Sequence, residues 1–164
     1  MSLEADHIEL ANRNHETLLY LVKEAESHPE WVATVAFYKA VQIIEAIFDV
    51  DSRGHSNGHD NRINSLKCPK YRELFRAYRP LYAASLVARY LEDTSARKFE
   101  PGNPPKKCYS RFTDYMPADR VVHSLLKKRL DVIEQHAVQF LSDAGKASLK
   151  RIQQFLDSLA KDAE

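Results

Sequence analysis

The chain has 164 residues, a length that suits one domain with a substantial core, and we predict a single domain over residues 1–164. Hydrophobic residues make up 44% and charged residues 29%, as in soluble globular proteins. No apolar run approaches the roughly 20 residues that span a bilayer, which argues against a membrane protein. Cys68 and Cys108 form no close metal-binding pair, so we interpret them as free thiols of a cytoplasmic protein.

The net charge of +1 hides a strong segregation of charge along the chain. Residues 1–52 carry 3 basic and 10 acidic side chains, whereas residues 53–111 carry 13 basic and 5 acidic ones. Residues 112–164 carry 8 of each sign. A basic middle segment of this kind can bind a polyanion, or it can lie against the acidic first segment. Both interpretations stay open at this point.

Helical periodicity predicts two long helices in the first third of the chain. A first helix over residues 3–27 has one apolar face, formed by Leu10, Leu18, Leu21, Val22 and Ala25. A second helix over residues 29–51 begins at Pro29, a residue suited to the first helical position. Because this second segment is apolar nearly all round, we expect it to be the central helix of a bundle.

Turn signals divide the rest of the chain into further helices. Gly54 and the Asn57-Gly58 pair mark a turn, after which we predict helices over residues 59–67 and 70–94, the latter kinked at Pro80. Residues 95–117 contain four prolines and no period, and we expect a long loop there. Two more helices are predicted, from 117 to before Gly145 and over 146–163. With no strand pattern visible, the fold class is all-α, an up-and-down bundle of about five to six helices.

Two polar residues fall on apolar helix faces and predict a buried ion pair. Arg89 lies near the centre of the apolar face of the 70–94 helix, and Glu45 lies on the Trp31 side of the central helix. A buried arginine costs several kcal/mol unless it is paired. We therefore expect Arg89 to meet Glu45 inside the bundle, either to fix helix register or to hold the arginine beside a pocket.

The stretch RGHSNGHDNR, residues 53–62, holds two of the four glycines in the chain. His55 and His59 stand four residues apart, a spacing that binds metal when both rings share a helix face. Asn57-Gly58 interrupts any such helix, and no third ligand stands at a suitable spacing. We therefore expect no metal and no cofactor. A solvated turn without chemistry is one interpretation of the stretch.

The other interpretation is catalysis or anion binding. Histidine titrates near neutrality, so His59, assisted by His55, would act as general acid and base on the ribose 2′-hydroxyl or the leaving oxygen of RNA. Arg53 would stabilise the charge on the phosphorane. Arg62, Asn61 and Arg89 are predicted to bind the substrate.

The order of three segments resembles a known family. A tyrosine-bearing central helix (WVATVAFYKAVQIIEAIF) is followed by RGHSNGHDNR and then by YRPLYAASLVARY. This order is similar to a prokaryotic branch of the HEPN domains (higher eukaryotes and prokaryotes nucleotide-binding), over roughly residues 3–90. The resemblance implies an α-helical bundle that forms a homodimer. It also implies either a metal-independent endoribonuclease of a toxin–antitoxin or other defence system, or an inactive binding module.

The family's active motif is an arginine followed, after four to six residues, by a histidine, with two motifs meeting across the dimer. Arg53 with His59 fits this spacing, and so does Arg129 with His136. Gly54 and Leu130 follow the two arginines, where the family usually has a polar residue. We prefer Arg53 and His59 because His55 and Arg62 surround them. The resulting hypothesis is an RNA- or nucleotide-binding protein. Its rival is a non-catalytic interaction module whose protein partner would be, for example, a nucleotidyltransferase.

Overall fold

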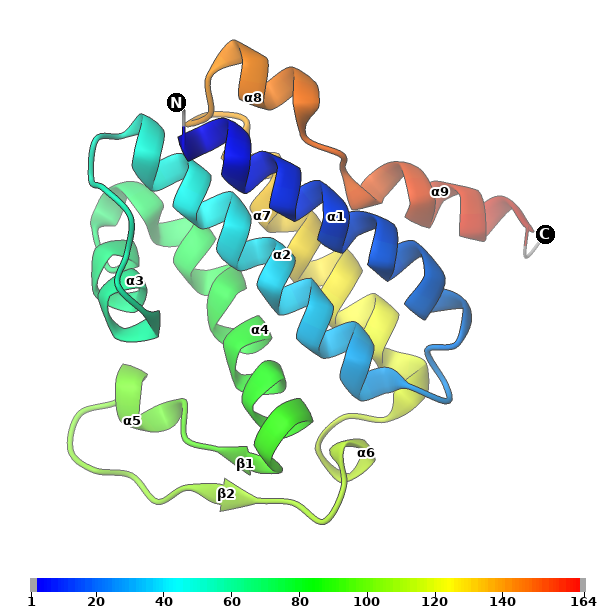
Figure 1. The fold of residues 1–164 in the computed structure, drawn as a ribbon. Helices are drawn as coiled ribbons and strands as arrows, with labels where there is room; N and C mark the ends of the chain where they lie inside the picture. Colours follow the sequence, from blue (N-terminus) through cyan, green and yellow to red (C-terminus); the bar gives the residue numbers. More distant parts are fainter. Residues whose placement is uncertain (1–2, 163–164) are drawn as a thin grey trace.

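The computed structural model describes residues 3–162. It is an all-α helical bundle, which confirms the fold class expected from the sequence. Helix α2 lies between α1 on one side and α4 and α7 on the other, and the helices run side by side (Figure 1). Their bounds are α1 Leu3–Lys23, α2 Pro29–Val50, α4 Arg72–Tyr90 and α7 Asp131–Ala137.

Helix α2 forms the core of the bundle, as its apolar sequence predicted. Its buried side chains point in nearly every direction around the helix axis. Its length and apolar composition also meet the criteria for a membrane span, contrary to the expectation that no segment would. However, 78% of the apolar window is buried inside the protein, as in the core helix of a soluble protein.

The 51–58 turn connects α2 to α3 (His59–Leu66) and accounts for two of the glycines. Gly54 has a φ of 74° and Gly58 a φ of 122°, backbone angles that side chains with a Cβ rarely adopt. Gly58 directly precedes the first residue of α3. The predicted turn and the short helix after it are therefore both present.

Helix α4 is shorter than the predicted 70–94 helix. Pro69–Tyr71 forms a 3₁₀ turn before it, and it continues through Pro80 to Tyr90. Leu91 then takes a left-handed conformation with a φ of 56°, which ends the helix.

The predicted loop 95–117 is more structured than expected. Two-residue strands β1 (Glu92–Asp93) and β2 (Lys107–Cys108) pair antiparallel, and the short helices α5 (Ala96–Phe99) and α6 (Phe112–Tyr115) flank β2 in the chain. Strands of two residues are too short to show an alternating pattern, which is why the sequence did not reveal them. The Phe99 ring packs edge-on against Tyr82 of α4, so this segment lies against the bundle.

The C-terminal third departs most from the prediction. A 3₁₀ turn over Ala118–Arg120 and a π-helical stretch over Val122–Leu130 lead into α7, which ends at Ala137. Gly145 does not separate two helices. It lies inside α8 (Asp143–Ser148), and the chain breaks later, before α9 (Ile152–Asp162).

A buried polar network accounts for the break between α8 and α9. The ammonium group of Lys39, on α2, donates to Glu134, to His15 Nδ1 at 3.0 Å and to the carbonyl of Lys150 at 2.8 Å. Glu134 also accepts from the backbone N–H of Ile152 at 2.6 Å. Burial, outweighing the attraction within the pair, lowers the pKa of Lys39 and raises that of Glu134. These bonds satisfy backbone groups that a continuous helix would otherwise pair internally.

Candidate functional site

Arg53 and His59 lie beside different parts of α2, and their side chains do not meet. The Arg53 guanidinium lies over the Tyr71 ring, 5.1 Å from its centroid, and Tyr71 contacts Phe48. The His59 ring instead lies 5.6 Å from the Phe37 ring. Phe48 follows Phe37 by eleven residues on α2, a separation of about 16 Å along the helix axis. The predicted catalytic pair is therefore not assembled within one chain, because the 51–58 turn carries the chain back along α2.

Glu45 is buried as predicted, but its partner is Arg62 rather than Arg89. Arg62 Nε donates to Glu45 Oε1 at 2.7 Å, and both side chains are almost fully buried. Arg89 lies beside Tyr38, seven residues before Glu45 on α2 and so about 10 Å away along the axis. The predicted Glu45–Arg89 pair is wrong because a helical wheel shows on which face a residue lies but not its position along the helix axis.

Residues of the 51–58 turn also contact the Glu45 carboxylate. Ser56 donates to Glu45 from its backbone N–H at 2.9 Å and from its hydroxyl. His55, half-exposed, places Nδ1 at 3.2 Å from Glu45 Oε2. Burial opposes ionisation of Glu45, but the bonds from Ser56 and Arg62 outweigh it and lower the pKa. Asn61, one of the predicted binding residues, is exposed on α3.

His59 is held in one tautomer by Arg62. The Nη1 group of Arg62 lies 2.9 Å from His59 Nδ1, and a guanidinium only donates hydrogen bonds. Nδ1 is therefore the acceptor, and the proton of the neutral ring is on Nε2. Burial, with the charges of Arg62 and Arg89, lowers the pKa of His59. The histidine is consequently neutral at pH 7, with its N–H group on Nε2.

Arg89 reaches the surface of the bundle beside His59. Its Nε donates to the Ser85 carbonyl at 3.0 Å and its Nη1 to the Tyr38 hydroxyl at 3.0 Å. The guanidinium also lies over the Tyr90 ring, 4.9 Å from the centroid. The arginine is thus positioned by aromatic side chains and carries no carboxylate partner among the described residues.

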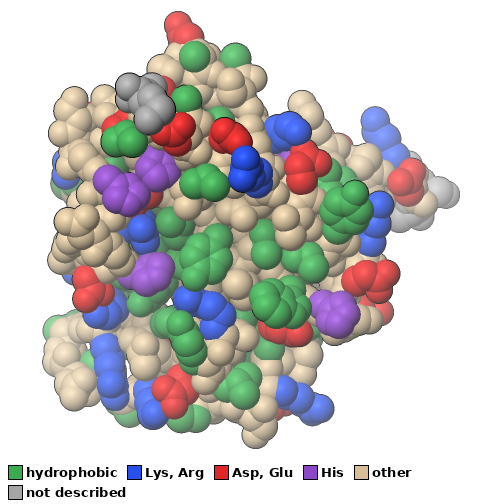
Figure 2. Space-filling view, viewed as in Figure 1, with side chains coloured by type: hydrophobic (Ala, Val, Ile, Leu, Met, Phe, Trp, Pro, Cys, Tyr) green, Lys and Arg blue, Asp and Glu red, His purple; other side chains and the backbone are tan. Residues whose placement is uncertain are grey.

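Aromatic side chains around Arg89 are exposed to solvent. Tyr38 is 36% and Tyr90 61% exposed, and Trp31, about 10 Å from Tyr38 along α2, is 56% exposed. Figure 2 shows histidine side chains along the left of one face, with basic and hydrophobic groups beside them. The arrangement combines an N–H donor, a fixed positive charge and exposed rings, which are the groups that bind phosphate and nucleobases.

The second spacing match, Arg129 with His136, does not form a site either. Arg129 lines a groove with Arg76 and Arg79, whereas His136 lines a different pocket with Phe140. The two side chains therefore lie at different surfaces of the protein and form no common site.

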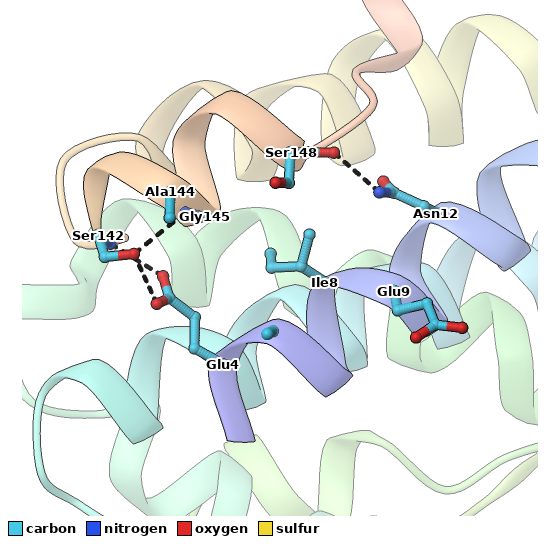
Figure 3. Close-up of a pocket in the computed structure, with 9 residues that line it drawn as sticks. Glu4, Ile8, Glu9, Asn12, Ser142, Ala144, Gly145 and Ser148 are labelled. Atoms are coloured by element: carbon cyan, nitrogen blue, oxygen red, sulfur yellow. Dashed lines mark hydrogen bonds between the residues drawn. The ribbon is translucent and has the colours of Figure 1, made fainter. Parts of the chain in front are cut away.

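A pocket of about 580 Å³ lies between α1 and α8. Figure 3 shows Glu4 facing Ser142 at one end and Asn12 facing the backbone of Ser148 at the other, with Ile8 between them. Asn12 Nδ2 donates to the Ser148 carbonyl at 2.8 Å, so both ends are closed by bonds within the protein. No basic or histidine side chain is among the residues lining it, so it offers no positive charge to a phosphate.

Two groups of residues were missed by the sequence interpretation. The network of Lys39, Glu134 and His15 joins three helices, and Lys39 gave a signal as the one basic residue in the apolar α2 segment. His7 was also missed, because its neighbours come from distant parts of the chain: its Nδ1 bonds Gln42 at 2.7 Å, and its ring stacks on that of His55.

Comparisons with known proteins do not add to this description: no family model, no curated protein and no solved structure matches the chain.

Proposed function

We propose that this protein is a cytoplasmic, dimeric, HEPN-like domain that binds single-stranded RNA or nucleotides at the surface formed by His59, Arg89, Tyr38 and Tyr90. The single observation that carries the proposal is the position of the Arg89 guanidinium, which lies over the rings of Tyr38 and Tyr90 and near enough to His59 for its charge to lower the pKa of that histidine. The basic middle of the chain and its resemblance to HEPN domains support it.

The chemistry of the surface suits a phosphate carrying a base. Arg89 donates from Nε to the Ser85 carbonyl, from Nη1 to the Tyr38 and Tyr90 hydroxyls and from Nη2 to the Ser85 hydroxyl. Of its five N–H groups, one on Nη2 is left for a phosphate oxygen. The Nε2–H group of His59 adds a neutral donor. Tyr90, exposed beside Arg89, provides a ring face on which a base can stack, an interaction worth about 1–3 kcal/mol per base.

The geometry favours binding over cleavage. A general base must accept the 2′-hydroxyl proton at a ring nitrogen that faces the substrate. His59 Nδ1 is occupied by Arg62, and Nε2 already carries the proton. Cleavage would require His59 to exchange tautomers, which the bond from Arg62 opposes. Arg53, the predicted second catalytic group, contacts Tyr71 and Asp51 instead.

Fluorescence anisotropy with a labelled single-stranded RNA at low salt tests the proposal. The wild-type protein is expected to bind, more weakly as salt is raised, because phosphate contacts release counterions. Arg89→Ala is expected to lose at least about tenfold in affinity, since a charged hydrogen bond contributes roughly 1.5–3 kcal/mol. Arg72→Ala removes an exposed arginine from the same helix and is the matched control. Equal affinity of the two variants would contradict the proposal.

The second candidate function is a protein-interaction module. Tyr38 and Tyr90 beside Arg89, Trp31 farther along α2 and Leu91 at 38% exposure favour it, because aromatic side chains are enriched at protein interfaces. In this case the surface would contact a second copy or another protein. Trp31→Ser would then weaken self-association in analytical ultracentrifugation and leave RNA affinity unchanged.

A further inference from the structure

Three side chains from three separate segments meet at one end of the bundle. His7 comes from α1, Glu45 from α2 and His55 from the 51–58 turn, and one ligating atom from each lies within 4.8 Å of the others. Two imidazoles and one carboxylate form a donor set that suits divalent transition metals. This set does not include His59, the partner that the His55 spacing indicated.

The distances between these atoms are close to those of a bound ion. In a tetrahedral zinc site with bond lengths near 2.0–2.1 Å, neighbouring ligand atoms are roughly 3.4 Å apart. His55 Nδ1 and Glu45 Oε2 are already 3.2 Å apart. The His7 and His55 rings lie parallel, with 7° between their planes and 5.1 Å between their centroids. Because an imidazole binds a metal in the plane of its ring, the half-exposed His55 side chain would rotate out of this stack when both rings bind one ion.

Gln42 orients His7 for this role. The oxygen of its amide faces His7 Nδ1 at 2.7 Å and can only accept a hydrogen bond, so Nδ1 carries the proton. The lone pair of the neutral ring is then on Nε2, which is free to bind a cation. A hydrogen bond that fixes the second ring nitrogen in this way is the usual companion of a metal-binding histidine.

Glu45 is held in place by groups that leave a cation room to bind. Arg62 and the Ser56 hydroxyl both donate to Oε1, and the arginine balances the charge of the carboxylate. Oε2 accepts the Ser56 N–H at 2.9 Å, and a carboxylate oxygen has a second lone pair. Mg²⁺ and Ca²⁺ prefer all-oxygen sites, so a set with two imidazoles selects Zn²⁺, Co²⁺ or Ni²⁺ instead.

We propose that His7, Glu45 and His55 bind one divalent transition-metal ion, with zinc as the biological occupant. Three protein ligands leave a fourth position for water or an external ligand. The bound ion would tie the 51–58 turn to α1. This inference does not depend on the RNA-binding proposal, because it is tested without nucleic acid.

Cobalt(II) titration of the purified protein, followed by visible absorption, is the test. The wild-type protein is expected to give a saturable spectrum at one equivalent that added zinc abolishes and added magnesium leaves intact. His7→Ala and His55→Ala are each expected to weaken binding at least about tenfold, and Gln42→Leu to weaken it severalfold through the orientation of His7. His123→Ala removes an exposed histidine elsewhere and is the matched control.

Thermal unfolding gives an independent readout, since an ion that binds only the folded chain raises its melting temperature. Zinc should raise the melting temperature of the wild type and of His123→Ala, but not that of His55→Ala. Absence of a saturable cobalt spectrum would overturn the proposal. Equal binding by wild type, His7→Ala and His55→Ala would overturn it as well.

Discussion

At the scale of single residues, Arg62 contacts both Glu45 and His59, which the sequence analysis treated as separate features. It neutralises the buried Glu45 and at the same time sets the tautomer of His59. The sequence identified Glu45 as a buried acid that needs a cation, and this part was correct. It assigned Arg62 to substrate binding instead, which is wrong because the side chain is buried against Glu45; a residue in a glycine-rich polar stretch has no visible reason to be buried. Arg62 pairs with Glu45 because of where α3 lies relative to α2, and the local sequence does not show this.

Gly145 is the residue whose role is most open to direct testing. A Cβ at this position would lie 2.2 Å from Glu4 Oε1, an atom that accepts the Ser142 N–H at 2.9 Å. Gly145→Ala is therefore expected to destabilise the protein by about 1–2 kcal/mol through loss of the Glu4 bonds, despite the better helix propensity of alanine. Urea denaturation measures this change.

The control is the same substitution in a Glu4→Ala background, where the obstructing carboxylate is absent. There, Gly145→Ala should be neutral or stabilising by up to about 1 kcal/mol, because only the helix propensity remains. A stabilising effect in the wild-type background would contradict the account of the α1–α8 contact.

At the scale of elements, the helices with a strong apolar period were predicted to within a few residues. These are α1, α2 and α4, where local sequence and packing agree, whereas the polar α3 was predicted from the turn signals before it. The prediction failed between residues 137 and 152, where Gly145 was interpreted as a helix end. The break there is held by Lys39 and Glu134, residues distant in sequence, and local pattern gives no information about such contacts.

The buried network of Lys39, Glu134 and His15 predicts that the stability of the fold depends on pH. Burial and the charge of Lys39 lower the pKa of His15 to about 4 in the folded protein, against 6.5 in the unfolded chain. Between pH 6.5 and pH 4 the unfolded chain binds more protons than the folded one, so stability falls as pH falls. The loss in the free energy of unfolding that is due to His15 reaches at most about 3 kcal/mol near pH 4 and is absent above pH 7.

Chemical denaturation of wild type and His15→Gln at pH 7 and pH 4.5 isolates this contribution. The variant should lose less stability than the wild type over this interval, because glutamine does not titrate. His123→Gln should behave as the wild type does. Parallel losses in wild type and His15→Gln would show that His15 is not the group responsible.

At the scale of the whole molecule, the structure shows how the segregated charges are used. Part of the basic middle segment pairs with the acidic first segment, as one of the two interpretations expected: Arg62 with Glu45, and Lys70 with Asp51. Other basic residues, Arg89 among them, are not paired in this way and lie at the surface beside aromatic rings. The pairing interpretation is therefore confirmed for Arg62 and Lys70, whereas polyanion binding by the second group stays a prediction, on which the proposed RNA surface rests.

The measurement that tests this account most directly is a proton–nitrogen NMR spectrum of the histidine rings, recorded while single-stranded RNA is added. Near neutral pH the account predicts that His59 is neutral, with the proton on Nε2 and none on Nδ1. It also predicts that RNA shifts the His59 signals and leaves those of the exposed His123 in place. A proton on Nδ1, or RNA binding that leaves His59 unchanged, would contradict the assignment of the binding surface.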